Sequence, residues 1–269
     1  MTWLVWAGWL MGVVLLAGLG AGLAATRCRA GQLERLLADN ERKLEQLQGQ
    51  FERFVPPDVV ERLTDERGGY APQRREVTIL FADLRGFTAL CDRLDPALTV
   101  TILNEYFRRM DAAVTRHHGH ITELVGDGLL ALFGALEPNP WQGRDSVLAA
   151  LAMREALAGY NTELLGRSLP ELRFGIGIHS GEVVAGLMGA GELSKFSITG
   201  DPINVASRVE GLTREFGVDL LVTNEIRTTL DTRFQLTAMR PVLVKGKPEP
   251  IQTYHVQGLM HEADHANQR

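Results

Sequence analysis

The chain opens with an apolar run. Residues 1–26 contain no charged side chain and are rich in Leu, Val, Ala, Gly and Trp. A helix needs about 20 apolar residues to cross the hydrocarbon core of a bilayer, so this run is long enough to span one. A cleaved signal peptide is the alternative, but it would have a basic start and a shorter apolar core. We therefore expect an uncleaved transmembrane anchor over residues 1–26.

Basic residues follow this run at once. Arg27, Arg29 and Arg35 have no counterpart ahead of the span. The positive-inside rule therefore predicts a single-pass protein of the inner or plasma membrane, with everything after the span in the cytoplasm. Cys28 is close enough to the span to be acylated, although an unmodified thiol is the simpler expectation.

The next segment, residues 27–55, repeats apolar positions in alternating steps of four and three residues. The repeating positions are Leu33, Leu37, Asn40, Leu44, Leu47, Phe51 and Phe54. This is the spacing of a coiled-coil seam, in which Asn40 would fix the register. An amphipathic helix lying on the following domain would also bury one stripe. Polar and charged residues cover the other faces, which favours a narrow seam and a parallel homodimer.

A connecting segment, residues 56–75, begins with Pro56-Pro57, and a folded domain follows over residues 76–257, with a tail over 258–269. The pattern predicts strands over Val77–Ala82, Ile121–Val125 and Leu129–Phe133, and helices over Pro96–His117, Trp141–Tyr160 and Pro202–Phe216. It also predicts that Leu172–Ile178 and Val183–Leu187 pair around His179-Ser-Gly181. This alternation indicates an α+β fold, a mostly antiparallel sheet with helices on one face.

Charge and cysteine content exclude two classes of function. The net charge is −5, which gives no electrostatic footprint for a nucleic acid, so we expect no nucleic-acid partner. Cys28 and Cys91 are far apart in sequence and suggest neither a disulfide framework nor a metal knuckle.

Two aspartates at predicted strand ends are the candidate metal-binding residues. Asp83 ends the first predicted strand of the domain, and Asp127 lies at the tip of a predicted hairpin, between two glycines. On adjacent strands the two carboxylates would repel unless divalent cations lay between them, so the pair predicts two Mg²⁺ or Mn²⁺ ions. The alternative is that both are ordinary turn residues. Gly86, which precedes the start of a helix, favours a catalytic role for the two aspartates, because backbone N–H groups at a helix start can bind a triphosphate.

Five segments in order resemble the motifs of the class III nucleotide cyclases. They are Phe81–Thr88, Val125–Gly134, Gly175–Val184, Gly200–Glu210 and Val244–Lys247. The resemblance covers about residues 70–257. It implies a ferredoxin-like βαββαββ catalytic domain that forms a head-to-tail homodimer with composite active sites. It also implies conversion of ATP or GTP to the cyclic nucleotide and pyrophosphate.

The resemblance assigns roles to individual residues. Asp83 and Asp127 match the metal-binding aspartates, with the backbone of Leu84 as an extra ligand. Asn204 and Arg208 match the pair that the partner subunit contributes to the transition state, and their spacing puts both on one helix face. Residues that would meet the substrate phosphates are Gly86, Phe87, Thr88 and Lys245, with Lys247 as the alternative to Lys245. His179 lies within a family motif, and we interpret it as structural.

The choice of base depends on Glu123, four residues before Asp127. In the family a lysine at this position indicates adenine and a glutamate indicates guanine, because a carboxylate accepts from guanine N1–H and the 2-amino group. The second base-contacting position is Ser197, whose hydroxyl suits either purine. We favour GTP. An adenylate cyclase with unusual base contacts and a catalytically silent nucleotide-binding regulator are the alternatives. Any input signal would come through the span, the coiled coil or a partner membrane protein.

Overall fold

The computed structural model describes residues 72–188, 195–244 and 247–260. All of them belong to one compact unit, Arg62–Arg269. The predicted span over residues 1–26, the predicted coiled coil over 27–55 and most of the segment over 56–75 lie outside the described ranges. Among the helices in those ranges, none has both the length and the apolar character needed to cross a membrane.

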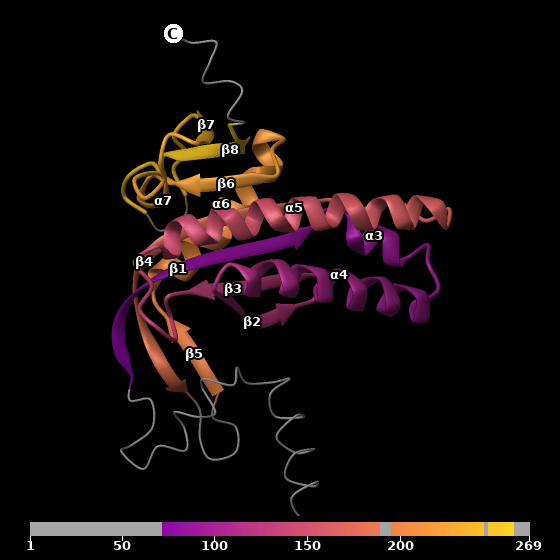
Figure 1. Cartoon of the computed structure of the whole chain (residues 1–269), viewed down its shortest axis with the longest axis horizontal. Helices are drawn as coiled ribbons and strands as arrows, with labels where there is room; N and C mark the ends of the chain where they lie inside the picture. Colours follow the sequence, from indigo (N-terminus) through magenta and orange to yellow (C-terminus); the bar gives the residue numbers. More distant parts are fainter. Residues whose placement is uncertain (1–71, 189–194, 245–246, 261–269) are drawn as a thin grey trace, which may run out of the picture. The chain divides into compact units, whose positions relative to one another are not determined.

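Strands and helices alternate along the described residues (Figure 1). The strands are β1 (Gln73–Leu84), β2 (Gly119–Val125), β3 (Gly128–Phe133), β4 (Phe174–Met188), β5 (Lys195–Thr199), β6 (Leu220–Thr223), β7 (Phe234–Ala238) and β8 (Thr253–Leu259). The helices are α3 (Phe87–Cys91), α4 (Pro96–Arg116), α5 (Gln142–Gly166), α6 (Asp201–Phe216) and α7 (Asn224–Arg227). Within the described residues, every strand and helix predicted between Val77 and Tyr160, and the helix from Pro202, is present, and α5 departs most from its expected bounds, since it continues to Gly166.

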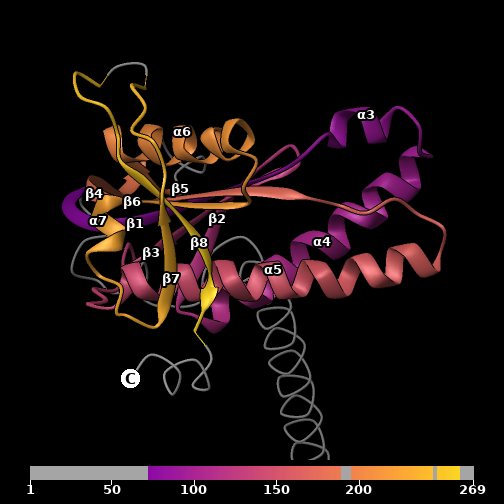
Figure 2. The same cartoon turned by 90° about the horizontal axis from the view of Figure 1, so that it is seen from above.

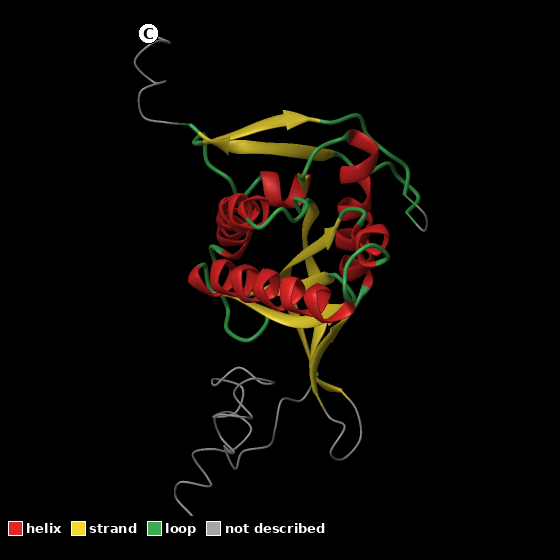
Figure 3. Cartoon of the chain, turned by 90° about the vertical axis from the view of Figure 1, so that its right-hand side faces the viewer, coloured by secondary structure: helices red, strands yellow, loops and turns green. Residues whose placement is uncertain are grey.

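These strands form one sheet in the order β2-β3-β1-β4-β6-β8-β7, and β5 pairs with β4 outside that path. Neighbouring strands are antiparallel except for β4 and β6. The β7–β8 pair lies at one end of the sheet, at the top of Figures 1 and 3. The predicted α+β class and the mostly antiparallel sheet are therefore confirmed, with β1 and β4 at the centre.

Helices cover both faces of the sheet, so the prediction that they lie on one face is wrong. Leu80 and Ala82 of β1 pack into a core with α4 and α5, whereas Val77 and Ile79 pack into a second core with Ala206 of α6. Successive side chains of a strand point to opposite faces, so the two cores lie on opposite sides of β1. Figure 2 shows α6 on one side of the strands and α5 on the other.

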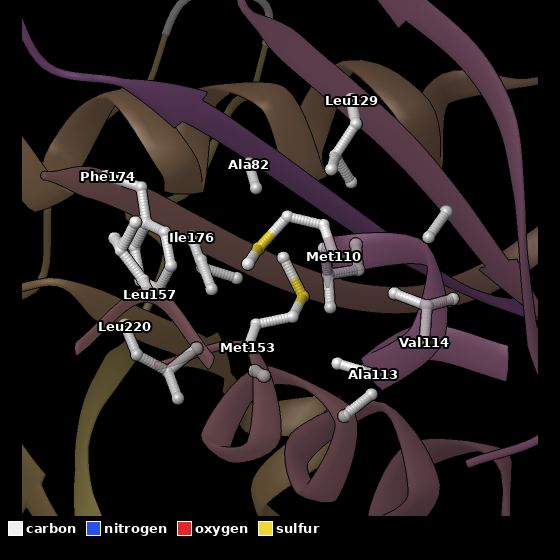
Figure 4. Close-up of a cluster of buried hydrophobic side chains, with 14 of the residues drawn as sticks. Ala82, Met110, Ala113, Val114, Leu129, Met153, Leu157, Phe174, Ile176 and Leu220 are labelled. Carbon is white, nitrogen blue, oxygen red and sulfur yellow. The ribbon is translucent and has the colours of Figure 1, made fainter. Parts of the chain in front are cut away.

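The larger core fixes α4 and α5 against the sheet. Met110 of α4 and Met153 of α5 are fully buried and point toward one another beside Ile176 of β4 (Figure 4). Burying a side chain of this size stabilises the fold by about 1.5–3 kcal/mol relative to leaving it exposed. The unbranched methionines fill the gap between the two helices and the strand. This packing holds the C-terminal end of β1, where Asp83 lies, in one place.

Strand β4 is one continuous strand, and the predicted hairpin around His179-Ser-Gly181 is wrong. β1 pairs with β4 over twelve residue pairs, from Gln73 opposite Ala185 to Leu84 opposite Phe174. The polar residues that suggested a turn are bonded inside the sheet. His179 Nδ1 lies 2.9 Å from Thr223 Oγ1, and Ser180 Oγ lies 2.5 Å from Thr78 Oγ1. Because its polar groups find partners, the segment has no need to turn toward solvent. The structural interpretation of His179 is confirmed.

Candidate active site

Asp83 lies near the end of β1, between two glycines of the neighbouring strands. Gly175 of β4 is its direct register partner, and Gly128 of β3 lies beside it, since Ala82 pairs with Leu129. A Cβ atom on Gly128 would stand 2.9 Å from Asp83 Oδ1. The carboxylate therefore occupies space that any larger residue at Gly128 would take. Asp83 shares its face of the sheet with Ile79, the face that α6 covers.

Asp127 lies in the turn between β2 and β3, as predicted. Val125 pairs with Gly128 across the turn, and Gly126 has a φ of 63°, in the left-handed region that glycine adopts without strain. Burial and the charge of Asp127 both raise the pKa of Asp83, while Arg214 opposes them. The fold thus brings Asp83 and Asp127, 44 positions apart in the sequence, close enough to repel one another.

The pair fits a divalent cation by the chemistry of its donors. Two carboxylates that repel each other are stabilised by a cation between them, and Mg²⁺ and Mn²⁺ prefer oxygen ligands. In the described part of the chain, no group of three or more His, Cys, Asp or Glu side chains is placed to hold a metal. The backbone carbonyl of Leu84 and the oxygens of water and substrate are further donors of the kind that these ions take.

The segment after Asp83 forms the short helix α3. Gly86 precedes it with a φ of 68°, and no side chain caps the helix start. Phe87 is buried, whereas Thr88 is exposed. The phenyl ring thus anchors the turn in the core, and the backbone N–H groups of the first helical turn receive no side-chain cap.

Asn204 and Arg208 lie on α6, on the face turned away from the sheet. Ala206 and Glu210 mark the side of α6 that faces the sheet, because they lie against Gly177 of β4. A Cβ atom on Gly177 would stand 2.1 Å from Glu210 N and 2.7 Å from Ala206 O. With about 3.6 residues per turn, positions 204 and 208 fall on the opposite side of the helix. Asn204 is exposed, and Arg208 is partly buried with no hydrogen-bond partner for Nη1 in the described part of the chain. Asn204 and Arg208 thus lie one helical turn apart, and among the described residues neither forms a hydrogen bond or an ion pair with Asp83.

The residues expected to contact the base lie on separate strands. Glu123 is half-buried in β2 opposite Leu130, next to a shift in the β2–β3 register. Ser197 is half-buried in β5 opposite Gly186. Lys245 lies outside the described residues, whereas Lys247 forms an ion pair with Asp201 at the start of α6.

Sequence reasoning missed two neighbours of Asp83. Glu210 of α6 lies beside Gly175, and burial together with the charge of Asp83 raises its pKa to about 7, against the opposing charges of Arg214 and Arg85. Tyr106 of α4 is fully buried, its hydroxyl has no partner among the described residues, and burial and the two aspartates raise its pKa. The alternating glycines 175 and 177 were the available signal, because glycines within a strand mark close approach of another backbone.

Comparison with known proteins agrees with this geometry. The family described as the adenylate and guanylate cyclase catalytic domain matches residues 70–258. The adenylate cyclase of Anabaena cylindrica is 34% identical over 248 residues, which are 87% of this chain and 48% of that protein.

Solved structures of both kinds of cyclase share the fold. The guanylyl cyclase Cya2 is 33% identical with a TM-score of 0.66, over 72% of this chain and 97% of that one. The adenylyl cyclase CyaB from P. aeruginosa is 25% identical, also with a TM-score of 0.66, over 71% and 98%.

The match covers the described domain but not the whole of the relatives. This chain spans about half or less of the length of the curated proteins it matches first. The family match covers well over half of the chain itself, and the matching region contains Asp83, Asp127, Asn204 and Arg208. The chain therefore belongs to the class III adenylate and guanylate cyclases, a family of lyases.

Proposed function

We propose that this protein is a membrane-anchored homodimeric cyclase that converts a purine nucleoside triphosphate, GTP in preference to ATP, to the 3′,5′-cyclic nucleotide and pyrophosphate. The observation that carries the proposal is the pair of carboxylates, Asp83 and Asp127, at the glycine-flanked end of β1. Domain boundaries follow the sequence: an anchor over 1–26, a coiled coil over 27–55, a connection over 56–75, the catalytic domain over 76–257 and a tail over 258–269.

Asp83 and Asp127, with the carbonyl of Leu84, would hold two Mg²⁺ or Mn²⁺ ions. Such ions, when bound, supply charge that activates the ribose 3′-hydroxyl and neutralises the phosphate oxygens. The chain's own contribution is to fix the two carboxylates in position. Gly128 leaves room for the Asp83 carboxylate, and Gly175, the register partner of Asp83, leaves room for Thr213 and Glu210 of α6.

The placement of Asn204 and Arg208 supports a composite site. Both lie on the face of α6 turned away from Asp83, so a second copy of the chain would have to present them. There Asn204 would orient the ribose, and Arg208 would stabilise charge developing on the α-phosphate.

Two elements would bind the phosphates. The uncapped start of α3 offers the backbone N–H groups of Phe87 and Thr88, after the tight turn at Gly86. Of the two lysines in the last motif, Lys247 is already paired with Asp201. This pairing favours Lys245 as the lysine that meets the terminal phosphates.

Glu123 favours guanine as the base. Its carboxylate can accept two hydrogen bonds from guanine, whereas adenine N1 would face it as a second acceptor. The charge-assisted bond lost with adenine is worth about 1.5–3 kcal/mol. The similarity to an adenylate cyclase of 34% identity keeps ATP as the competing substrate, and the Ser197 hydroxyl suits either base.

We place the protein in the inner or plasma membrane as a single-pass protein with its catalytic domain in the cytoplasm. The support is the uncharged run over residues 1–26 and the arginines that follow it. A signal would reach the catalytic dimer through the span, a partner membrane protein or the coiled coil, whose register would set how the two domains face each other.

Mixing two inactive variants tests the composite site. Asp83→Ala and Arg208→Ala should each abolish cyclase activity in the purified full-length chain with Mn²⁺. A mixed dimer has one site with both lesions and one site with neither, so coexpression should restore up to about half of the wild-type activity per mixed dimer. Absence of recovery, despite mixed dimers isolated through two affinity tags, would overturn the shared site. Wild-type protein that binds nucleotide without turnover would indicate the silent regulator instead.

A further inference from the structure

A cavity lies on the side of the sheet opposite Asp83. It has a volume of about 390 Å³ and is bounded by α5, the start of β4, the loop between α6 and β6, and β8. Phe174 of β4 lines it and packs in the core of α4 and α5, whereas the next residue, Gly175, faces α6. Because neighbouring residues of a strand face opposite ways, this cavity is separate from the proposed nucleotide site.

Basic side chains dominate the polar wall of the cavity. Arg85, Arg154, Arg173 and His255 line it, and Asp219 is the single acidic residue among the lining residues described. Asp219 is already engaged, since Arg154 donates to its two oxygens at 2.7 and 3.0 Å and His255 Nε2 lies 3.5 Å from it. Arg154 also donates to the carbonyls of Val256 and Gln257. Arg154 is thus held rigidly, with its own charge matched.

The other two arginines, Arg173 and Arg85, have no comparable acidic partner among the described residues. Within the described residues, Arg173 has an exposed side chain with neither a hydrogen bond nor an ion pair. Arg85 donates through Nη2 to the carbonyl of Val218, but its buried Nε has no partner in the same residues. Glu210 lies near Arg85 and offsets part of its charge. An excess of positive charge at Arg173 and Arg85 therefore remains at the cavity.

The remaining wall is apolar, formed by Leu157 and Ala158 of α5 together with Leu172, Phe174 and Val218. A cavity of a few hundred Å³ with an apolar wall and a few convergent polar groups is typical of a small-molecule site. We propose that this cavity binds a small organic anion, with a phosphate or carboxylate group against Arg173 and Arg85 and an apolar body against Leu157 and Phe174.

A ligand bound in the cavity would affect the proposed catalytic end of β1 through one backbone hydrogen bond. The amide of Arg85 donates to the carbonyl of Arg173 at 2.7 Å, and Arg85 stands two residues after Asp83 and next to Gly86. A ligand that fixes Arg173 and Arg85 therefore restrains the segment carrying both the metal ligand and the phosphate-binding turn. The anion thus acts as an effector of the cyclase rather than as a substrate.

Binding is tested on the purified full-length chain in EDTA, so that no divalent ion recruits phosphate to Asp83 and Asp127. The probes are phenyl phosphate, inorganic phosphate and benzoate. Phenyl phosphate well above its Kd should raise the Tm by about 2–4 °C. Inorganic phosphate, without the apolar body, should bind more weakly, and benzoate shows whether a carboxylate suffices.

Paired arginine variants locate the site. Arg173→Gln should weaken phenyl phosphate binding at least about tenfold by calorimetry, because a charge-assisted contact is lost. Arg116→Gln removes an exposed arginine on α4 away from the cavity and should leave the Kd unchanged. No Tm rise in the wild type, or equal weakening in both variants, would overturn the site.

Cyclase rate tests the effector role separately. Phenyl phosphate at saturating Mn²⁺ and nucleotide should change the wild-type rate at least about twofold and leave that of Arg173→Gln unchanged. Binding without a change of rate would overturn the effector role. If the protein proved to have no cyclase activity, the calorimetry would still decide whether the cavity binds anions.

Discussion

Asp83 and Gly128 lie side by side on β1 and β3, so close that a methyl group on Gly128 would stand 2.9 Å from Asp83 Oδ1 and 3.1 Å from the Ala82 carbonyl oxygen. The atom it meets first is the end of a side chain that can move, so the fold should tolerate the change while the carboxylate is displaced. We expect Gly128→Ala to change the free energy of unfolding by less than about 2 kcal/mol. Cyclase activity with Mn²⁺ should fall at least about tenfold, because displaced catalytic groups lose rate steeply.

Gly159 provides the matched control for this substitution. It lies within α5, and a Cβ there would meet nothing within 4 Å. Gly159→Ala should therefore raise the free energy of unfolding by about 0.5–1 kcal/mol and leave the activity unchanged. The reading of Gly128 would be wrong if Gly128→Ala kept full activity, or if its activity fell only in proportion to unfolding measured by urea denaturation.

The buried hydroxyls of Tyr106 and Tyr160 form a natural pair for comparison. Tyr160 Oη donates to the carbonyl of Ile102 at 3.2 Å, whereas Tyr106 Oη has no partner in the described part of the chain. Tyr160→Phe should lower the free energy of unfolding by about 1 kcal/mol, since one buried hydrogen bond is lost. Tyr106→Phe should leave it unchanged or raise it, because an unpaired buried hydroxyl is removed. A larger loss from Tyr106→Phe than from Tyr160→Phe would show that its hydroxyl is bonded in solution.

Glu210 should make stability depend on pH near neutrality. Burial and Asp83 raise its pKa from 4.5 to about 7, so the folded protein holds this proton more tightly than the unfolded chain does. The stabilisation from that proton is full below pH 4.5 and is lost as the pH rises to about 7. The Tm of the wild type in EDTA should therefore fall relative to that of Glu210→Gln across this range.

An exposed glutamate separates this effect from a general loss of charge. Glu155 lies on α5 with its side chain exposed. Glu155→Gln should follow the wild-type curve of Tm against pH instead of that of Glu210→Gln. If Glu210→Gln and the wild type changed in parallel, Glu210 would be ionised across the range, and its carboxyl would be better solvated than the structure places it.

Most helices and strands could be predicted from local sequence patterns, because apolar residues recur at different intervals in a helix and in a strand. The helix from Pro96 has buried residues at helical spacing, among them Ile102, Tyr106 and Met110. The hairpin around Asp127 is encoded by glycines flanking one turn. The error in β4 has a physical cause: His179 and Ser180 resemble turn residues in sequence, yet they bond to Thr223 and Thr78 on strands far away in the chain. No local pattern carries that information.

The same limit applies to the site. The proximity of Asp83 and Asp127 could be predicted because one lies near the end of a strand and the other in a short hairpin turn, each within a short motif, and the structure places them together. Glu210 and Tyr106 reach Asp83 only through the packing of α6 and α4 on opposite faces of the sheet. Helices on both faces could not be deduced from the stripe of each helix alone, because a stripe shows that a face is buried but not which side of the sheet buries it.

Glu123→Lys tests the identity of the base. The wild type with Mn²⁺ should form more cyclic GMP than cyclic AMP when GTP and ATP are offered separately. A lysine at this position donates to adenine N1 and opposes guanine N1–H, so the ratio of kcat/KM for ATP over GTP should rise about 10–100-fold. Ser197→Ala is the companion variant, since its hydroxyl serves either base, and it should lower both values alike. Cyclic AMP as the main product of the wild type would show that Glu123 does not face the base, and the adenylate cyclase assignment would replace ours.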